Sequence, residues 1–389
     1  MCLLAAGLIA LSLTVGCGSD TPTAPEVDTG QLDVGAYSTK PVPFADPDSP
    51  DIPRYFEAQR LANRMPVPAD TDPAFKFQRA GFAFVRTDAE NFDADAKDVI
   101  AGYATTGLSN EDDDIAIEMD TTVLAFPDSA AAARAATALA KTQLTTNEPV
   151  PIEKYPQASA HWRPSTQQLR TWYASERFVI VTELTDNAKR QLKTRDVPAL
   201  ARLTERNIDT VARRLAGYQP TALDKLGTVP LDPDRVLEYA VGRLESVNRT
   251  GKEKWFGGRG VYDGPAVYDG KGGLHLVGDS ASGRTMFEEN GIDRVAYNGG
   301  YLFRAKDAAA ALRARDWNAE LGKDYKTAEA PRNLPAARCK QSRKTSRSAS
   351  VRYICVVAHG RFAASAVAPQ LIDAQQRISA QYALLGAIE

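Results

Sequence analysis

Residues 119–135, MDTTVLAFPDSAAAARA, combine a strand-like run with an alanine-rich segment that starts after a good N-cap residue. Residues 297–313, YNGGYLFRAKDAAAALR, align with them without a gap. Asp120-Thr121 in the first stretch corresponds to Asn298-Gly299 in the second, which is a typical turn pair. Each copy therefore predicts a strand, a turn, a second strand and a helix.

A second pair of segments follows in the same order. Residues 170–184, RTWYASERFVIVTEL, and residues 351–367, VRYICVVAHGRFAASAV, each contain two strand-like runs around a turn. A helix is predicted after each pair of runs, at about 197–217 and about 368–386, because apolar side chains recur there at helical spacing. Both halves thus have the order β-hairpin, helix, β-hairpin, helix. The alternative is a chance likeness in an alanine-rich chain.

This order predicts the fold class. Antiparallel hairpins interleaved with helices are typical of an α+β protein, so we expect two related α/β-sandwich-like halves with packed helices. A disordered N-terminal tether precedes them, because residues 18–53 are rich in Pro, Asp, Thr and Ser and poor in large apolar side chains. Within it, residues 31–41 have enough apolar content to lie against the folded body, and a short helix is predicted from Ile52. Pro230 and Pro233 indicate the boundary between the halves.

The N-terminus carries an apolar run, Leu3 to Leu13, followed by small residues and Cys17. The run is shorter than the ~20 residues of a membrane span and has the length of a signal-peptide core. This pattern resembles the lipobox of bacterial lipoproteins. The resemblance implies cleavage before Cys17, attachment of a diacylglyceryl lipid with palmitate-type chains, and a position on the outer face of the cell membrane. The alternative is an ordinary secretory leader with an incidental cysteine.

The mature chain as a whole resembles an actinobacterial two-domain lipoprotein family of unknown function. The resemblance rests on the leader, on LDVGAYSTKP (32–41), on the two α+β halves and on the closing helix DAQQRISAQYALL (373–385). It implies a location and an architecture but no activity. The predicted division is a lipoprotein signal peptide at 1–16, a lipidated flexible tether at 17–51, an N-terminal α+β domain at 52–228 and a C-terminal α+β domain at 229–389.

Two of the four cysteines, Cys339 and Cys355, lie outside the leader. Disulfides persist in exported proteins, so these two residues are predicted to form one. The segment 338–352 between them is the one concentrated basic run of the chain. It is predicted to be a solvated loop closed by the disulfide, and the alternative is a surface for anionic headgroups or wall polymers.

Ser280 is the one candidate nucleophile. It lies in LHLVGDSASG (274–283), a strand-like run ending in Gly-Asp-Ser, which resembles the nucleophile block of GDS-type esterases. The resemblance implies a base in a late Asp-x-x-His pair, but here Val356 stands three residues before His359. The chain is therefore predicted not to be an enzyme and to have no catalytic residue.

The remaining motifs predict neither a cofactor nor a metal. There is no His-Glu-x-x-His and no Cys-x-x-Cys. The carboxylates of 93–98 and 110–120 are predicted to lie in solvated acidic loops, because neither segment has the glycine and glutamate positions of an EF-hand. GGRGVYDG (257–264) is not a dinucleotide fingerprint. GVYDGPAVYDG (260–270) is predicted to form consecutive turns that project tyrosines.

The overall charge argues against one class of function, the binding of nucleic acids. The formal net charge is -2, which gives no field that would attract a nucleic acid. We expect an extracytoplasmic, lipid-anchored envelope protein with a non-enzymatic binding or structural role. Its partners would be the membrane, through the lipid anchor, and an envelope polymer, a lipid or a protein. The alternatives are an extracytoplasmic serine hydrolase that uses Ser280 and a carrier of apolar ligands.

Overall fold

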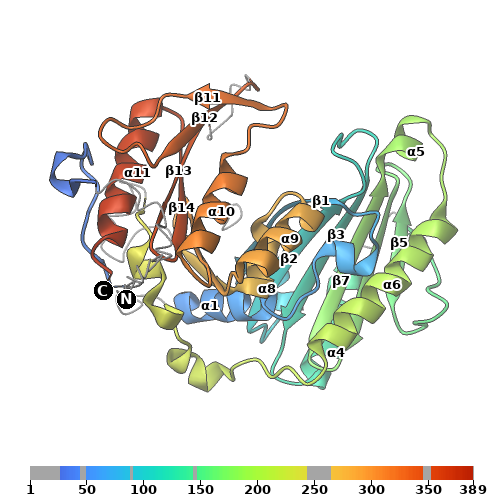
Figure 1. Ribbon diagram of the computed structural model, residues 1–389. Helices are drawn as coiled ribbons and strands as arrows, with labels where there is room; N and C mark the ends of the chain where they lie inside the picture. Colours follow the sequence, from blue (N-terminus) through green and yellow to red (C-terminus); the bar gives the residue numbers. More distant parts are fainter. Residues whose placement is uncertain are drawn as a thin grey trace, which may run out of the picture.

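The computed structural model describes residues 27–43, 50–87, 91–142, 147–242, 264–344 and 352–388. These residues form two seven-stranded antiparallel sheets that lie side by side, each with helices packed against it (Figure 1). The predicted α+β class is therefore confirmed.

The first sheet belongs to the N-terminal half of the chain. Its strand order is β1-β2-β3-β7-β6-β5-β4. Its longest pairing joins β3 and β7, which meet at the centre of the sheet. The strands are β1 (Phe77–Phe84), β2 (Ala101–Leu108), β3 (Ile117–Ala125), β4 (Glu148–Pro149), β5 (Ser159–Arg163), β6 (Gln168–Ser175) and β7 (Phe178–Asp186).

Helices cover both faces of the first sheet. Val179 packs with the alanine-rich helix α4 (Ser129–Thr142), whereas its neighbour Ile180 packs with α1 (Asp51–Ala62) and α6 (Val197–Leu215). Successive side chains of a strand point to opposite faces, so α4 lies on one face and α1 and α6 on the other. The helices predicted from Ile52 and at about 197–217 are both confirmed.

The second sheet repeats this plan. Read from its first strand, its order is β8-β9-β10-β14-β13-β12-β11, which is the order of the first sheet with the strand numbers shifted by seven. The alanine-rich helix α10 (Ala308–Ala319) covers one face, and α11 (Leu371–Leu385), predicted at about 368–386, covers the other. The strands are β8 (Ala266–Asp269), β9 (Arg294–Tyr297), β10 (Tyr301–Arg304), β11 (Tyr325–Ala328), β12 (Arg338–Ser342), β13 (Tyr353–His359) and β14 (Phe362–Ala368).

Local details of the repeat differ from the prediction. The turn at Asn298-Gly299 exists, and Gly299 has a positive φ of 75°. The prediction of a corresponding turn at Asp120-Thr121 was wrong. Both residues lie inside β3, which pairs with β2 on one side and with β7 on the other. Each half also has three strands before its alanine-rich helix and four after it, in place of two simple hairpins.

The N-terminal segment lies against the C-terminal half. Leu32 and Tyr37 are buried, and the Tyr37 hydroxyl donates a hydrogen bond to Asp373 on α11. The amide of Gln376, on the same helix, donates to the carboxylate of Asp33 at 3.1 Å. The expectation that residues 31–41 lie against the folded body is therefore confirmed.

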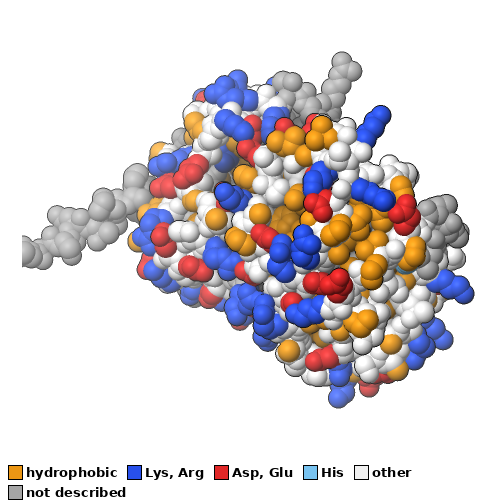
Figure 2. All heavy atoms as spheres, turned by 90° about the vertical axis from the view of Figure 1, so that its right-hand side faces the viewer, with side chains coloured by type: hydrophobic (Ala, Val, Ile, Leu, Met, Phe, Trp, Pro, Cys, Tyr) orange, Lys and Arg blue, Asp and Glu red, His pale blue; other side chains and the backbone are white. Residues whose placement is uncertain are grey.

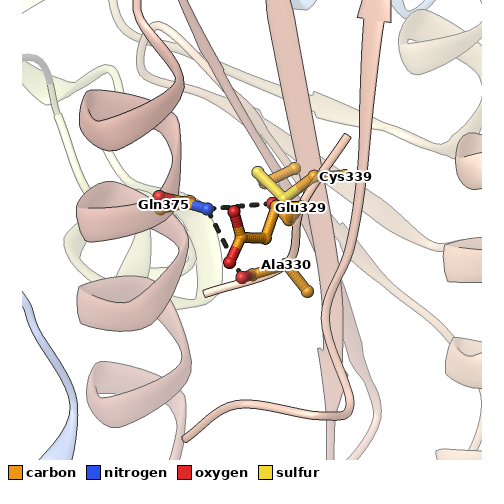
Figure 3. Close-up of a disulfide and its surroundings, with 5 residues drawn as sticks. Glu329, Ala330, Cys339 and Gln375 are labelled. Atoms are coloured by element: carbon orange, nitrogen blue, oxygen red, sulfur yellow. Dashed lines mark hydrogen bonds between the residues drawn. A yellow bond between two sulfur atoms is a disulfide. The ribbon is translucent and has the colours of Figure 1, made fainter. Parts of the chain in front are cut away.

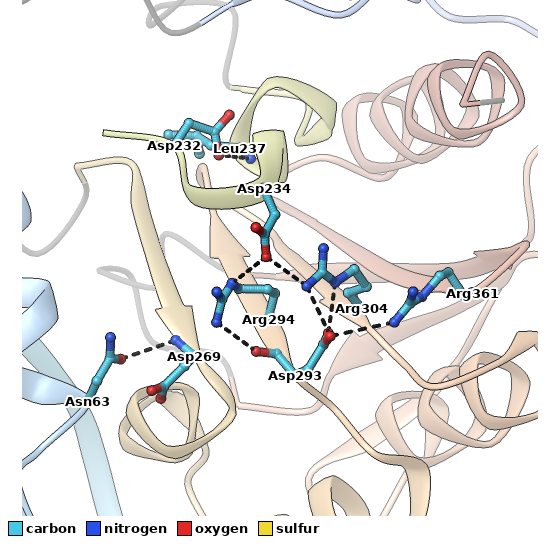
Figure 4. A network of polar contacts seen from close by, with 9 residues as sticks. All are labelled: Asn63, Asp232, Asp234, Leu237, Asp269, Asp293, Arg294, Arg304 and Arg361. Carbon is cyan, nitrogen blue, oxygen red and sulfur yellow. Dashed lines mark hydrogen bonds and ion pairs between the residues drawn. The ribbon is translucent and has the colours of Figure 1, made fainter. Parts of the chain in front are cut away.

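The connection between the halves is fixed to the second sheet by ion pairs (Figure 4). It contains the short 3-10 helices η3 (Pro233–Arg235) and η4 (Leu237–Tyr239). Asp234 accepts hydrogen bonds from Arg294 at 3.0 Å and Arg304 at 2.8 Å. Arg304 also pairs with Asp293, 2.8 Å away. These contacts attach the segment to the ends of β9 and β10.

Each half also caps an edge strand of the other. The side chain of Gln59 on α1 accepts a hydrogen bond from the Val267 N–H of β8 at 2.8 Å and donates to the Pro265 carbonyl at 3.2 Å. In return, the N–H of Gln78 on β1 donates to the Gly278 carbonyl at 2.8 Å. We call this contact between β1, β8, α1 and residues 278–280 the joint. It satisfies the backbone groups that an edge strand otherwise leaves open.

Candidate functional site

A pocket of about 780 Å³ lies where four segments of the N-terminal half meet. The segments are the start of α1, the end of β1, the region of α3 (Phe92–Asp95) and the 3-10 helix η2 (Leu223–Thr228). The apolar part of its lining comprises Pro50, Pro53, Val85, Ala96, Val99, Leu223 and Leu226. The volume falls within the ~300–1,000 Å³ that is usual for small-molecule sites. We call it the Arg54 pocket.

Arg54 forms one wall of this pocket. Its guanidinium donates to the carbonyls of Val99 at 2.6 Å and Ile100 at 3.0 Å, and it pairs with Asp51 at 3.1 Å. Burial lowers the pKa of Arg54. With its donors directed at fixed backbone groups, this side chain shapes the pocket by holding α1 to the start of β2.

Arg86 is a second arginine of the pocket, and its side chain is exposed. Its side chain is 61% exposed, and its guanidinium lies 3.5 Å from Asp93 and 3.9 Å from Asp51. Exposed ion pairs of this kind contribute little, about 0–1 kcal/mol, so they exchange readily. The lining also contains the carboxylates of Asp93 and Asp98, so an apolar surface is combined with charges of both signs.

Ser280, the candidate nucleophile, lies away from this pocket at the joint. Its side chain is buried, and its hydroxyl donates to Oε1 of Gln78 at 3.0 Å. A side-chain amide is not a base that could take a proton from a serine. The preceding Asp279 accepts a hydrogen bond from the Ser282 N–H at 2.9 Å and so caps the helix α9 (Ser280–Asn290). The geometry gives Ser280 a role in holding β1 and α9 together.

The residues before Ser280 also differ from the prediction. Residues 274–276 form the 3-10 helix η5 (Leu274–Leu276) and no strand. Within it, the ring of His275 is fully buried, with Nδ1 at 3.3 Å from the Thr105 hydroxyl and Nε2 at 3.3 Å from the Met65 carbonyl. Because a carbonyl only accepts, the proton of the neutral ring is on Nε2. Burial lowers the pKa of His275 to about 4.

The disulfide between Cys339 and Cys355 is present, as predicted. The two cysteines are directly opposite each other on β12 and β13, and both are buried. Figure 3 shows the disulfide beside Gln375 on α11, whose amide donates to the carbonyl of Glu329 at 2.9 Å. The other predicted site cysteine, Cys17, lies outside the described residues.

The basic run is partly a strand, which corrects the loop predicted for 338–352, because Arg338–Ser342 form β12. Residues 345–351 lie outside the described residues. Lys340 donates to the Glu320 carbonyl at 2.8 Å and lies over the ring of Tyr325, 4.7 Å from its centroid. Burial lowers the pKa of Lys340. This lysine is thus directed at its own half of the molecule.

The prediction of solvated acidic loops is confirmed for residues 111–115, which are exposed, but it was wrong for 117–120, which lie in β3, and for 93–95, which belong to the helix α3. In the loop, Glu111 pairs with Lys323 of the C-terminal half at 2.6 Å, and Asp113 pairs with Arg79 at 2.9 Å. Within the described ranges, no group of three or more His, Cys, Asp or Glu side chains is arranged to hold a metal ion.

Of the two copies of the Val-Tyr-Asp-Gly motif, the structure describes only the second in full. The GGRGVYDG segment and the first copy, apart from Gly264, lie outside the described residues. The second copy forms β8 and the start of the helix α8 (Gly270–Gly273), and its tyrosine, Tyr268, is buried. The prediction of turns that project tyrosines was wrong for this copy. The segment is a strand that pairs with β9, and Tyr268 packs in the core.

Charged side chains of both signs are interspersed over the face that Figure 2 draws. On that face the described residues provide no single-sign field that would steer a charged polymer. Among the helices in the described ranges, none has both the length and the hydropathy needed to cross a bilayer.

Comparison with known proteins finds two family models that match this chain. A family model described as the N-terminal part of a domain of unknown function, DUF7373, matches residues 44–231. The model of its C-terminal part matches residues 245–387. The chain belongs to the DUF7373 family. No curated protein matches it.

In this DUF7373 protein, sequence patterns did not reveal the Arg54 pocket. Its walls come from residues 50–54, 85–99 and 223–227, of which the last lie more than a hundred residues after the others, and none of these segments carries a motif. A weak signal was the apolar Leu223 and Leu226, which precede the proline-rich boundary. Only the contact of η2 with α1 brings these residues to the pocket.

Proposed function

We propose that this DUF7373 protein is an exported, lipid-anchored binding protein without enzymatic activity. Its anchor is the lipid on Cys17, at the outer face of an actinobacterial cell membrane, and it presents the Arg54 pocket to an amphipathic ligand that has an anionic group. The observation that supports the binding role is the pocket itself, with an apolar lining, a fixed Arg54 wall and an exposed Arg86 that lies beside the carboxylate of Asp93. The lipobox-like end of the leader supports the anchor.

The anchor is tested by the variant Cys17→Ser. We expect it to move the protein from the membrane fraction to the soluble extracytoplasmic fraction, because a two-chain lipid supplies the membrane affinity. Cys2→Ser is the matched control and should leave the distribution unchanged. A Cys17→Ser protein that stays in the membrane fraction would refute the anchor.

The pocket is tested with 1-anilinonaphthalene-8-sulfonate, which combines apolar rings with one anionic group. We expect Arg86→Glu to weaken its binding at least tenfold, because the charge facing the sulfonate is reversed. Leu223→Trp places an indole at the 44% exposed pocket wall and should also weaken binding. The matched control is Leu192→Trp, at a 72% exposed site on another surface. Equal affinity in both tryptophan variants would refute the pocket as the site.

The serine hydrolase stays a prediction of the sequence, and no contact of Ser280 favours it. Replacing Ser280 by alanine and assaying p-nitrophenyl acetate hydrolysis tests it directly. Unchanged background hydrolysis would remove this alternative.

A further inference from the structure

The charges in the lining of the Arg54 pocket are balanced. The lining contains two arginines, Arg54 and Arg86, and two aspartates, Asp93 and Asp98. A purely anionic ligand therefore meets two carboxylates as well as two guanidinium groups, and a purely cationic ligand meets the reverse. Because a like charge is repelled, a ligand with a single charge is complementary to only half of this lining.

The two arginines differ in how firmly they are held. Arg54 donates to backbone carbonyls at 2.6 and 3.0 Å and pairs with Asp51 at 3.1 Å. Arg86 has longer contacts, 3.5 Å to Asp93 and 3.9 Å to Asp51, at an exposed site where ion pairs are weak. An anionic group of a ligand can therefore share or replace the contacts of Arg86 at little cost.

Asp98 supplies a carboxylate that is not engaged in this way. It is exposed, and within the described residues its side chain takes part in no hydrogen bond or ion pair. Its backbone is left-handed, with a φ of 70°, a conformation in which aspartate and asparagine are enriched. The buried side chains of Ala96 and Val99, on either side of it in the chain, belong to the same lining. Asp98 thus places a negative charge beside an apolar wall.

Apolar surface supplies the other contacts of the pocket. Leu223 is 44% exposed although its side chain is aliphatic, and Leu226 and Pro53 line the pocket with it. Covering such surface is favourable. The volume of about 780 Å³ lies in the range of sites that hold drug-sized molecules, so an apolar body and a polar headgroup can be bound together.

Resting on the binding role proposed above, we propose that the ligand of the Arg54 pocket is a zwitterionic amphiphile. Its anionic group pairs with Arg86, its cationic group pairs with Asp98, and its apolar body covers Leu223. When Arg86 turns to the ligand, Asp93 loses its own contact, and the cationic group of the ligand restores a partner for it. The headgroup thus satisfies charges of both signs, which a purely anionic headgroup does not.

Isothermal titration calorimetry with three octyl amphiphiles tests this charge pattern. Octylphosphocholine is zwitterionic, octyl sulfate is anionic and octyltrimethylammonium is cationic, so the three probes differ only in the headgroup. Each is used below the concentration at which it forms micelles, with the full Cys17→Ser chain, so that no lipid of the protein itself takes up the probe. We expect octylphosphocholine to bind about fivefold more tightly than either of the others, the upper end for one ion pair at an exposed site.

The variant Asp98→Asn isolates the cationic group. Asparagine has the same size and also tolerates a positive φ, so the backbone is preserved. We expect Asp98→Asn to weaken the binding of octylphosphocholine about fivefold without weakening that of octyl sulfate. The matched control is Glu153→Gln, which removes an exposed carboxylate outside the pocket and should change neither affinity.

Two results would overturn the zwitterionic ligand. One is equal or tighter binding of octyl sulfate than of octylphosphocholine, and the other is an equal effect of Asp98→Asn and Glu153→Gln. If 1-anilinonaphthalene-8-sulfonate still binds and responds to Arg86→Glu, the proposed binding role stands and only the zwitterionic ligand fails. If neither this dye nor any octyl probe binds, both proposals fail.

Discussion

His275 joins the halves of the molecule through an uncharged ring. It comes from the C-terminal half, and both of its hydrogen-bond partners, Thr105 and Met65, belong to the N-terminal half. Its ring also lies 5.3 Å from that of Tyr103. The ring is fully buried, and burial disfavours the charged imidazolium because it removes its hydration. The buried site therefore favours the neutral form.

The predicted consequence is a loss of stability in acid. Burial lowers the pKa of His275 from 6.5 to about 4, so between these values the unfolded chain binds a proton that the folded chain does not. The contribution is complete above pH 6.5 and is lost as the pH falls toward 4, to a total of about 3 kcal/mol. The variant His275→Gln cannot titrate. Urea unfolding at pH 7.5, 5.5 and 4.5 should show the wild type losing stability relative to this variant.

Asp120 should have the opposite dependence on pH. Burial, with Glu118 and Glu183 nearby, raises its pKa to about 6, although Thr106 donates to it. The folded state then favours the protonated form, so the contribution of Asp120 to stability is complete below pH 4 and is lost as the pH rises through 6. Asp120→Asn should raise the free energy of unfolding at pH 7.5 by about 1–3 kcal/mol.

The matched control for Asp120 is Asp209. Its pKa is lowered despite burial, because Lys154 and Tyr155 donate to its carboxylate. Asp209→Asn should therefore reduce stability at pH 7.5, as measured by the same urea titration. If both asparagine variants changed stability in the same direction, the assignment of Asp120 would be wrong.

At the scale of elements, local patterns predicted the β6–β7 and β13–β14 hairpins, because their turns and alternating side chains lie within one short segment. They also predicted α6 and α11, whose apolar stripes face the sheets. The prediction of a turn at Asp120-Thr121 was wrong for a physical reason. Asp and Thr are compatible with a turn, but pairing with strands on both sides stabilises the extended chain more.

The disulfide acts on one pair of elements. Cys339 and Cys355 are separated by 16 residues and cross-link β12 to β13. Replacing both by alanine should reduce the free energy of unfolding by about 3 kcal/mol, chiefly because the unfolded chain gains freedom. Urea unfolding of the double variant and of the wild type, each without reductant, measures this difference. Equal midpoints would show that the cross-link does not stabilise the fold.

At the scale of the whole molecule, the joint makes the two sheets depend on each other. Gln59 is 1% exposed and bonds both the N–H of Val267 and the carbonyl of Pro265. Gln59→Leu leaves these two groups unpaired at ~1–3 kcal/mol each, so a loss of about 2–6 kcal/mol is expected. The matched control is Gln191→Leu, which removes an exposed hydrogen bond to the Asp114 carbonyl. It should change stability by less than about 0.5 kcal/mol. Thermal unfolding of the Gln59→Leu and Gln191→Leu variants measures the two losses of stability.

The sequence by itself determined the α+β class, the repeated order of strands and helices, the packed segment 31–41 and the Cys339–Cys355 pair. These properties depend on contacts between neighbours in the chain or on the count of cysteines. Only the tertiary structure decided the identical strand order of the two sheets, the burial of His275 and Ser280, and the Arg54 pocket. Each of these depends on side chains that are distant in sequence, and no local pattern specifies which edges and faces meet. The pocket and the buried polar residues therefore arise from packing between distant segments. The architecture, by contrast, can be predicted from the order of strands and helices along the chain.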